Sequence, residues 1–241
     1  MGMFGNINSS EEVVSTGDRI GGTALPTGIY ELVVDMAYLD VSARGAKFLG
    51  LSLVGANGEK HKEKIYFTTG DAKKNVNFYE KEGKKFQLAG YTLANELCLL
   101  TTGKLLEQQE DSMEPKSIKV YDFNAKKEIP VQKQIFMNVL GKPVAVALTN
   151  SLENKNKKNA QGNWVATTES RVAVGIRKFL ETETLLSVKE KAEDATEAKW
   201  SKDWQEKFGD KQVNNFTTIT DDSDGISETT NESPVENIFG T

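Results

Sequence analysis

The sequence of 241 residues contains a single cysteine, Cys98, and a single histidine, His61. A disulfide needs two cysteines and a Cys/His zinc site needs three or four such ligands, so neither can stabilise the fold. No apolar run approaches the ~20 residues of a membrane helix, and residues 1–10 lack the basic and apolar regions of a signal peptide. We therefore expect a cytoplasmic protein held together by an ordinary hydrophobic core.

Common catalytic motifs are also missing. The sequence contains no phosphate-binding Gly-x4-Gly-Lys-Ser/Thr, no Gly-x-Gly-x-x-Gly between a strand and a helix, and no Gly-x-Ser-x-Gly. His61 lies between two lysines and is interpreted as an exposed polar residue rather than a general base. Acid-x-Lys triplets of the kind seen in metal-dependent nucleases occur at residues 71–73, 82–84 and 197–199, but a chain that is 27% charged produces them by chance. We expect no enzyme, no metal and no cofactor.

Negative charge is concentrated at one end of the chain. The whole sequence carries 30 basic and 35 acidic residues, a net charge of −5. Residues 213–241 hold six of the acids and no Lys or Arg, which leaves 30 basic and 29 acidic side chains in residues 1–212. The body of the protein is therefore close to neutral, and the acidity belongs to its C-terminal segment.

Hydrophobic periodicity predicts a mainly β body with two helices. Alternation of apolar and polar residues predicts a strand at 29–41. Strand-like stretches with β-rich composition predict further strands at 46–54, 60–68, 117–123, 132–140, 143–152 and 163–179. Asn57-Gly58 is a strong hairpin signal between the second and third strands. A short helix carrying Cys98 is expected at 92–100, and an amphipathic helix at 187–208. Its aromatic residues Trp200, Trp204 and Phe208 are expected to pack on the sheet, with a partner-binding face as the alternative.

Composition divides the chain into three parts. Residues 1–26 are rich in Gly, Ser, Thr and Asn and are expected to form a flexible arm. Residues 27–212 form the folded domain. Residues 213–241 have too few apolar side chains to offset their ordering entropy, so a disordered acidic tail is expected. Ile238 and Phe239 lie almost at its end, where an apolar anchor can bind a pocket on another protein.

Basic side chains gather in the later strands. Between Lys119 and Lys178 there are eleven Lys or Arg residues and four acids, and aromatic residues are interleaved with them. This pattern is typical of surfaces that bind a nucleic-acid backbone, because each neutralised phosphate releases counterions. Exposed aromatic rings can stack on bases of any identity. The alternative is a solvated sheet face. The candidate nucleic-acid-binding residues are Lys60, Lys62, Lys64, Tyr66, Lys119, Tyr121, Phe123, Lys126, Lys127, Lys133, Lys155, Lys157, Lys158, Trp164, Arg171 and Arg177.

Two of these groups have a predicted geometry. Lys60, Lys62, Lys64 and Tyr66 alternate onto one face of the third strand, while His61, Ile65 and Phe67 point to the other. Residues 153–162 are interpreted as a basic, amide-rich hairpin turn able to clamp a flexible strand.

A series of short motifs resembles bacteriophage single-stranded DNA-binding proteins, over roughly residues 17–208. The motifs are Gly28-Ile29-Tyr30-Glu31, Glu63-Lys64-Ile65-Tyr66-Phe67-Thr68, Asn77-Phe78-Tyr79, Lys81-Glu82-Gly83-Lys84-Lys85, Leu97-Cys98-Leu99-Leu100-Thr101-Thr102-Gly103-Lys104, Val120-Tyr121-Asp122-Phe123 and Leu140-Gly141-Lys142. None is a catalytic signature, and the resemblance rests on their order and spacing.

The resemblance implies a fold and a role. It implies an OB-fold, a small Greek-key barrel that binds single-stranded DNA without sequence preference in phage replication and recombination, in the cytoplasm of the infected host. The acidic tail resembles those through which such proteins contact polymerase, primase or helicase, although Gly240 and Thr241 follow the terminal aromatic here. The rival functions are a phage structural or decoration protein and, less favoured, a recombination nuclease.

The charge distribution generates a prediction about the tail. A coil of 29 residues has a root-mean-square reach of about 30 Å, enough to fold back over one domain and compete with DNA for a basic surface. Deletion of residues 214–241 should therefore tighten DNA binding at low salt and abolish stimulation of a replication polymerase. Oligo-dT titrations of the two proteins measure the first effect, and equal affinities at low salt would contradict the competition.

Overall fold

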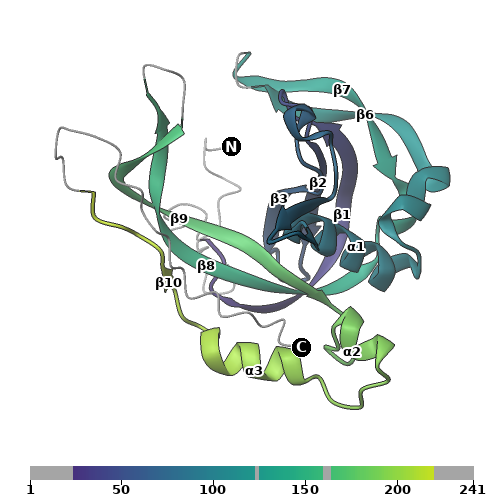
Figure 1. Cartoon of the computed structure of the whole chain (residues 1–241). Coiled ribbons are helices and arrows are strands. Elements are labelled where there is room, and N and C mark those ends of the chain that lie inside the picture. Colours follow the sequence, from purple (N-terminus) through teal and green to yellow (C-terminus); the bar gives the residue numbers. More distant parts are fainter. Residues whose placement is uncertain (1–23, 123–124, 160–163, 220–241) are drawn as a thin grey trace, which may run out of the picture.

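The computed structural model describes residues 24–122, 125–159 and 164–219 (Figure 1). Most of the expected N-terminal arm, the stacking candidate Phe123 and the tail residues Ile238 and Phe239 lie outside the described residues. Within them the protein is mainly β. The strands are β1 (Gly28–Val41), β2 (Lys47–Val54), β3 (Lys60–Tyr66), β4 (Phe78–Lys81), β5 (Lys84–Gln87), β6 (Met113–Asp122), β7 (Lys127–Phe136), β8 (Pro143–Lys158), β9 (Trp164–Leu180) and β10 (Val213–Asn214).

Helices are few and short. The α-helices are α1 (Ala89–Thr102), α2 (Val188–Ala192) and α3 (Lys199–Phe208), and the 3-10 helices are η1 (Asp71–Lys73), η2 (Leu106–Ser112) and η3 (Met137–Val139). In the described part of the chain, no helix combines the length and apolar character needed to cross a membrane.

One curved sheet contains every strand except β4 and β5. Its strand order is β10-β8-β1-β2-β3, and β9 pairs with the free edge of β8. β7 also pairs with β1, and β6 pairs with β7. All these pairings are antiparallel except the short parallel contact of β10 with β8. Figure 1 shows the hairpins β6–β7 and β8–β9 extending from the sheet toward the top of the view.

A bulge in β1 changes which side chains face the core. The register with β2 slips between Val34 and Met36, so Asp35 is the extra residue. Simple alternation assigns Ala37 and Leu39 to the face opposite Leu32 and Val34. Instead Ala37 is fully buried and Leu39 packs against the same core as Leu32. The aromatic ring of Tyr38 consequently lies on the outer face of the sheet.

The core lies between the inner face of the sheet and helix α1. Its large members include Leu32, Leu49 and Leu53 from the sheet, together with Leu97 of α1 and Phe179 of β9. Helix α1 begins close to the end of β3, because a Cβ at Gly90 would lie only 1.9 Å from the Tyr66 carbonyl oxygen. This glycine permits the close approach of helix to strand.

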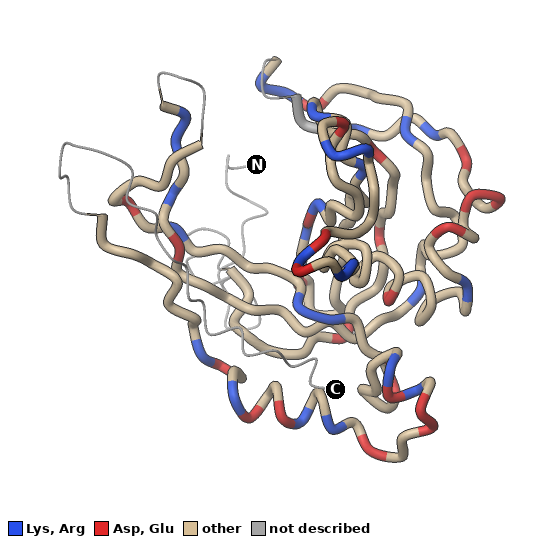
Figure 2. The backbone as a smooth tube through the Cα atoms, viewed as in Figure 1, with Lys and Arg blue, Asp and Glu red and all other residues tan. Residues whose placement is uncertain are grey.

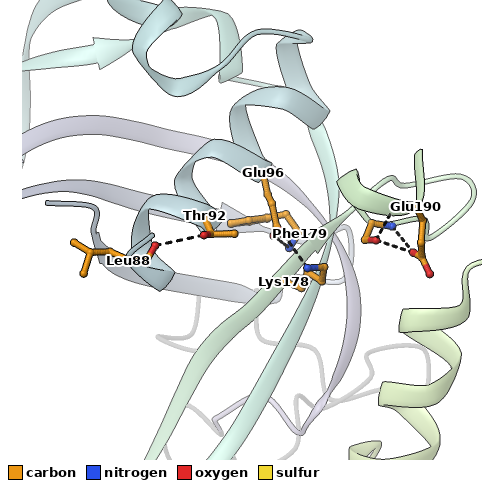
Figure 3. Close-up of polar contacts among 7 residues, drawn as sticks. Leu88, Thr92, Glu96, Lys178, Phe179 and Glu190 are labelled. Carbon is orange, nitrogen blue, oxygen red and sulfur yellow. Dashed lines mark hydrogen bonds and ion pairs between the residues drawn. The ribbon is translucent and has the colours of Figure 1, made fainter. Parts of the chain in front are cut away.

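The sheet remains open between β3 and β9, and carboxylates from β3 and α1 bind the free edge of β9. No β3–β9 ladder occurs in the described chain, so the expected barrel is not closed by backbone pairing. Glu63 Oε2 of β3 accepts a hydrogen bond from the Ile176 N–H of β9 at 2.9 Å. Farther along, Glu96 of α1 accepts from the Phe179 N–H at 3.3 Å and from Lys178 Nζ at 2.8 Å (Figure 3). We call this junction the β3–β9 seam.

The C-terminal part differs from the expectation of one long helix. Residues 187–208 form α2 and α3 with a break between them. Ser187 and Glu190 form a capping box, and Glu190 Oε1 also accepts from the Trp200 N–H at 2.8 Å, which fixes the start of α3. Trp204 is buried, and Trp200 stacks on it with ring centroids 5.8 Å apart. The expected packing of these two rings is confirmed.

The segment expected to be a disordered tail begins with an ordered stretch. Val213 and Asn214 form β10, and the Asn215 N–H donates to the Leu152 carbonyl at 2.9 Å. Thr217 exchanges two hydrogen bonds with the Asn154 side chain, at 2.8 and 2.9 Å. A truncation that removes only the acidic tail should therefore start after Ile219.

Glu96 is predicted to be essential for stability. Burial raises the pKa of its carboxyl, and the neighbouring Lys178 ammonium offsets part of that rise. Glu96→Ala would leave the Phe179 N–H and the half-buried Lys178 ammonium without their partner. Breaking a buried ion pair on one side costs about 3 kcal/mol of unfolding free energy, which urea denaturation measures. The exposed Glu206→Ala on α3 is the matched control, and an equal effect of both substitutions would contradict the role of Glu96.

Cys98 is predicted to be chemically inert in the folded protein. Its side chain is 1% exposed, and burial raises the pKa of its thiol to about 12. Because the thiolate is the reactive form, a thiol reagent at pH 8 should modify Cys98 only after denaturation. Ser117→Cys, on an exposed position of β6, should react at once in the native state and serves as the control. Rapid native labelling of the unmodified chain would contradict this burial.

Candidate nucleic-acid interface

The outer face of β3 carries the predicted row of lysines. Lys60, Lys62, Lys64 and Tyr66 are exposed, whereas His61 and Ile65 are buried, so the predicted alternation is confirmed. The interpretation of His61 as an exposed residue is wrong. It is 7% exposed, and its Nε2 lies 2.8 Å from Glu63 Oε2 inside the β3–β9 seam. The alternation that turns the lysines outward necessarily turns His61 inward.

Aromatic rings lie beside these lysines on the same face. Phe48 of β2 pairs with Tyr66 across the strands, with ring centroids 5.1 Å apart and an interplanar angle of 47°. Lys64 Nζ lies 5.1 Å from the Phe48 ring centroid, a cation–π contact. Tyr38 of β1 lies across Gly50 of β2, where a Cβ would meet its ring at 2.2 Å. We call Tyr38, Phe48, Tyr66, Lys60, Lys62 and Lys64 the outer β1–β3 surface.

The sequence identified Tyr66 but not Tyr38 or Phe48. The bulge at Asp35 turns Tyr38 to this face, and a one-residue phase change is not visible in the hydrophobic pattern. Phe48 is only 3% exposed, as a core residue would be. It is nevertheless on the outer face, where the side chains of Tyr66 and Lys64 cover its ring.

Two aspartates share this part of the sheet, and both are engaged. Asp40 accepts from Lys133 Nζ at 2.6 Å, and Asp35 accepts from the Ser52 hydroxyl at 3.1 Å. Lys133, a predicted nucleic-acid contact, is therefore paired and only 17% exposed. In the described part of the chain, Lys60, Lys62 and Lys64 have no carboxylate within ion-pair distance. The three lysines are therefore available to an external anion.

A second group of predicted residues lies at the end of the β8–β9 hairpin. Residues 153–158, expected in a turn, instead continue strand β8, which lengthens the hairpin. Trp164 is 64% exposed, and Lys158 Nζ lies 5.4 Å from its ring centroid. Lys157 is also exposed, whereas Lys155 pairs with Glu169 at 2.8 Å. The end of this hairpin therefore presents one large ring with two lysines that have no carboxylate partner among the described residues.

Arg171 and Arg177 lie at a shallow hollow on the same hairpin. The hollow has a volume of about 330 Å³, and the small residues Ala173 and Gly175 leave space between the two arginines. Arg171 pairs with Glu153 at 3.2 Å, and Arg177 Nε donates to the Thr149 hydroxyl at 3.2 Å. Arg177 is the extra residue of a bulge opposite Ala147 and Leu148. The bulge therefore adds an exposed cation to this rim.

The β3–β9 seam connects the two strands that carry these cations. Glu63 lies between Lys62 and Lys64 in β3, and its carboxylate contacts the N–H of Ile176, the neighbour of Arg177. Glu63 and Ile176 are turned inward, so Lys62, Lys64 and Arg177 leave their strands on the outer side of the seam. Outward-facing cations therefore flank the bridging carboxylate on both strands.

The remaining predicted residues lie on the β6–β7 hairpin, which in the described chain pairs with β1 and not with β3. Lys119, Lys126 and Lys127 are exposed, and Tyr121 lies in β6. Figure 2 shows basic residues near the outer ends of both long hairpins. The predicted nucleic-acid-binding residues that the structure describes thus lie in three groups, on β3, on the β8–β9 hairpin and on the β6–β7 hairpin.

Sequence comparisons do not assign the chain to a family. A scan against family models finds no match for the chain, and a search of curated proteins finds none. The described residues also contain no group of three or more His, Cys, Asp or Glu side chains placed to hold a metal ion. The geometry and chemistry of the basic and aromatic surfaces are therefore the features that bear on function.

Proposed function

We propose that the protein binds single-stranded DNA without sequence preference, with the outer β1–β3 surface as its central contact. The observation that carries the proposal is that the exposed Tyr66 ring lies on the same face of β3 as three lysines. These lysines have no carboxylate partner in the described chain. Bases offer π-faces to such a ring, and phosphates offer charge to the lysines. A duplex hides its base faces, so exposed rings favour an unpaired strand.

The order of the strands supports an OB-fold as the finer description. Strands β1, β2 and β3 form a meander, helix α1 follows, and the β8–β9 hairpin returns to pair with β1. OB-folds are partly open five-stranded barrels that bind oligonucleotides on the face of their second and third strands and on two adjoining loops. Here β2 and β3 would supply that face, the end of β8–β9 would supply one loop, and β6–β7 would be an insertion.

The proposed binding path includes the adjoining hairpin. Trp164 and Lys158 would hold the strand at the end of β8–β9, and Arg177 would contact phosphate beside the seam. The role in phage replication and recombination, with the tail recruiting polymerase, primase or helicase, forms part of the same proposal.

Lysine substitutions test the proposed surface. Single-stranded binding has a log–log salt slope of about −0.7 for each phosphate neutralised, so Lys62→Ala with Lys64→Ala should make the slope shallower by about 1.4. Tyr66→Ala should weaken binding about 5- to 150-fold, the equivalent of ~1–3 kcal/mol per stacked base. Fluorescence titration with oligo-dT at several salt concentrations measures both effects.

Lys189→Ala with Lys202→Ala provides the matched control for charge. These exposed lysines lie on α2 and α3, so the slope should remain that of the unmodified protein. Equal slope changes in both double variants would show that only overall charge matters and would reject the surface. Failure of the unmodified protein to bind single-stranded DNA at low salt would favour a structural or decoration protein, and magnesium- or manganese-dependent cleavage would favour a nuclease.

A further inference from the structure

The short hairpin β4–β5 stands apart from the main sheet. Its strands pair only with each other, and none of their eight residues is buried. Glu82 and Gly83 connect them with positive φ angles of 52° and 72°, the backbone of a tight two-residue hairpin turn. An isolated two-stranded hairpin is marginally stable and contributes no core here, so its exposed side chains need another explanation.

The two faces of this hairpin are chemically different. Tyr79 pairs with Phe86, and Lys81 pairs with Lys84, so these four side chains share one face. The Tyr79 and Phe86 rings stack with centroids 5.6 Å apart at 24°, and they are 48% and 42% exposed. The opposite face carries Phe78, Glu80, Lys85 and Gln87.

Only the opposite face has an acidic side chain that pairs with its lysine. Lys85 Nζ lies 3.9 Å from Glu80 Oε1 and 4.7 Å from the Phe78 ring centroid. Lys81 and Lys84 instead lie directly opposite each other, and like charges in that position destabilise a strand pair. An external anion removes this repulsion, and a ligand with flat aromatic groups covers the two rings.

We propose that the face carrying Tyr79, Phe86, Lys81 and Lys84 is a second binding site for unpaired nucleotides, with the rings stacking on bases and the lysines contacting phosphates. The base of the hairpin lies beside the outer β1–β3 surface. The Leu88 N–H donates to the Asn77 carbonyl at 2.9 Å, and Gly90 touches the carbonyl of Tyr66. A strand bound at Tyr66 would therefore have the hairpin beside it as the next part of its path. This inference rests on the proposed function and extends its binding path.

Two double variants of the full chain test the second site. Tyr79→Leu with Phe86→Leu keeps an apolar cross-strand pair but removes the aromatic faces, and it should weaken oligo-dT binding at least about fivefold. Lys81→Ala with Lys84→Ala should make the log–log salt slope shallower by about 1.4. Lys85→Ala, on the opposite face of the same hairpin, is the control and should leave the slope unchanged. The number of nucleotides covered per protein at saturation should fall in both double variants.

The outcomes separate this inference from the proposed function. If the unmodified chain binds oligo-dT and the Tyr66 variant is weakened, while both hairpin variants retain full affinity and site size, the second site is overturned and the outer β1–β3 surface stands. If the hairpin variants are weakened and the Lys62, Lys64 and Tyr66 variants are not, the second site stands and the outer β1–β3 surface is rejected. Absence of binding by the unmodified chain overturns both.

Discussion

The two carboxylates that bridge the β3–β9 seam are the constraint on which the rest of the structure depends. A buried backbone N–H requires a partner, and in the described chain no strand pairs with the edge of β9 opposite β8 to provide one. Glu63 and Glu96 supply the missing acceptors from a neighbouring strand and from α1. Without them, this edge of β9 would depend on the packing of Ile176 and Phe179 in the core. The free edge of β9 is thus held by one carboxylate from β3 and one from α1 instead of by a ladder along its length.

This form of closure affects the surface as well as the core. A full ladder would set the relation of β3 to β9 residue by residue. Instead, Glu63 links the two strands at Ile176 alone, and Glu96 links α1 to β9 at Phe179. In the described chain the longer part of β9 has no contact with β3 through backbone pairing. The β8–β9 hairpin can therefore leave the body and carry Trp164 outward. The same arrangement tolerates the bulge at Arg177, because Glu63 satisfies the N–H of the preceding residue.

Much of the secondary structure was predictable from the sequence, and the reasons for success and failure are physical. β1 was identified because one of its faces packs against the core, which produces alternation. β2 and β3 were identified because the Asn57-Gly58 turn connects them, and β9 because its composition is rich in β-forming residues. β4 and β5 were not, because their four-residue strands bury nothing and leave no hydrophobic period. The seam was also missed, since a carboxylate that accepts from a distant backbone N–H has no local signature. Among the candidate site residues, the β3 row was correctly oriented, whereas the ion pair of Lys133 with Asp40 depends on a strand pairing that sequence alone does not reveal.

The bulge at Asp35 also limits how this chain can change in length. One edge of β1 pairs with β8 through Gly28–Val33 and then with β7 at Tyr38 and Leu39, so the extra residue lies between the attachment points of the two long hairpins. Loss of that residue would exchange the inward-facing Ala37 and Leu39 with Tyr38 and Asp40 and reverse the two faces of half of the strand. Insertions and deletions should therefore be rare here in related chains, and far more frequent at the solvent-facing ends of the hairpins.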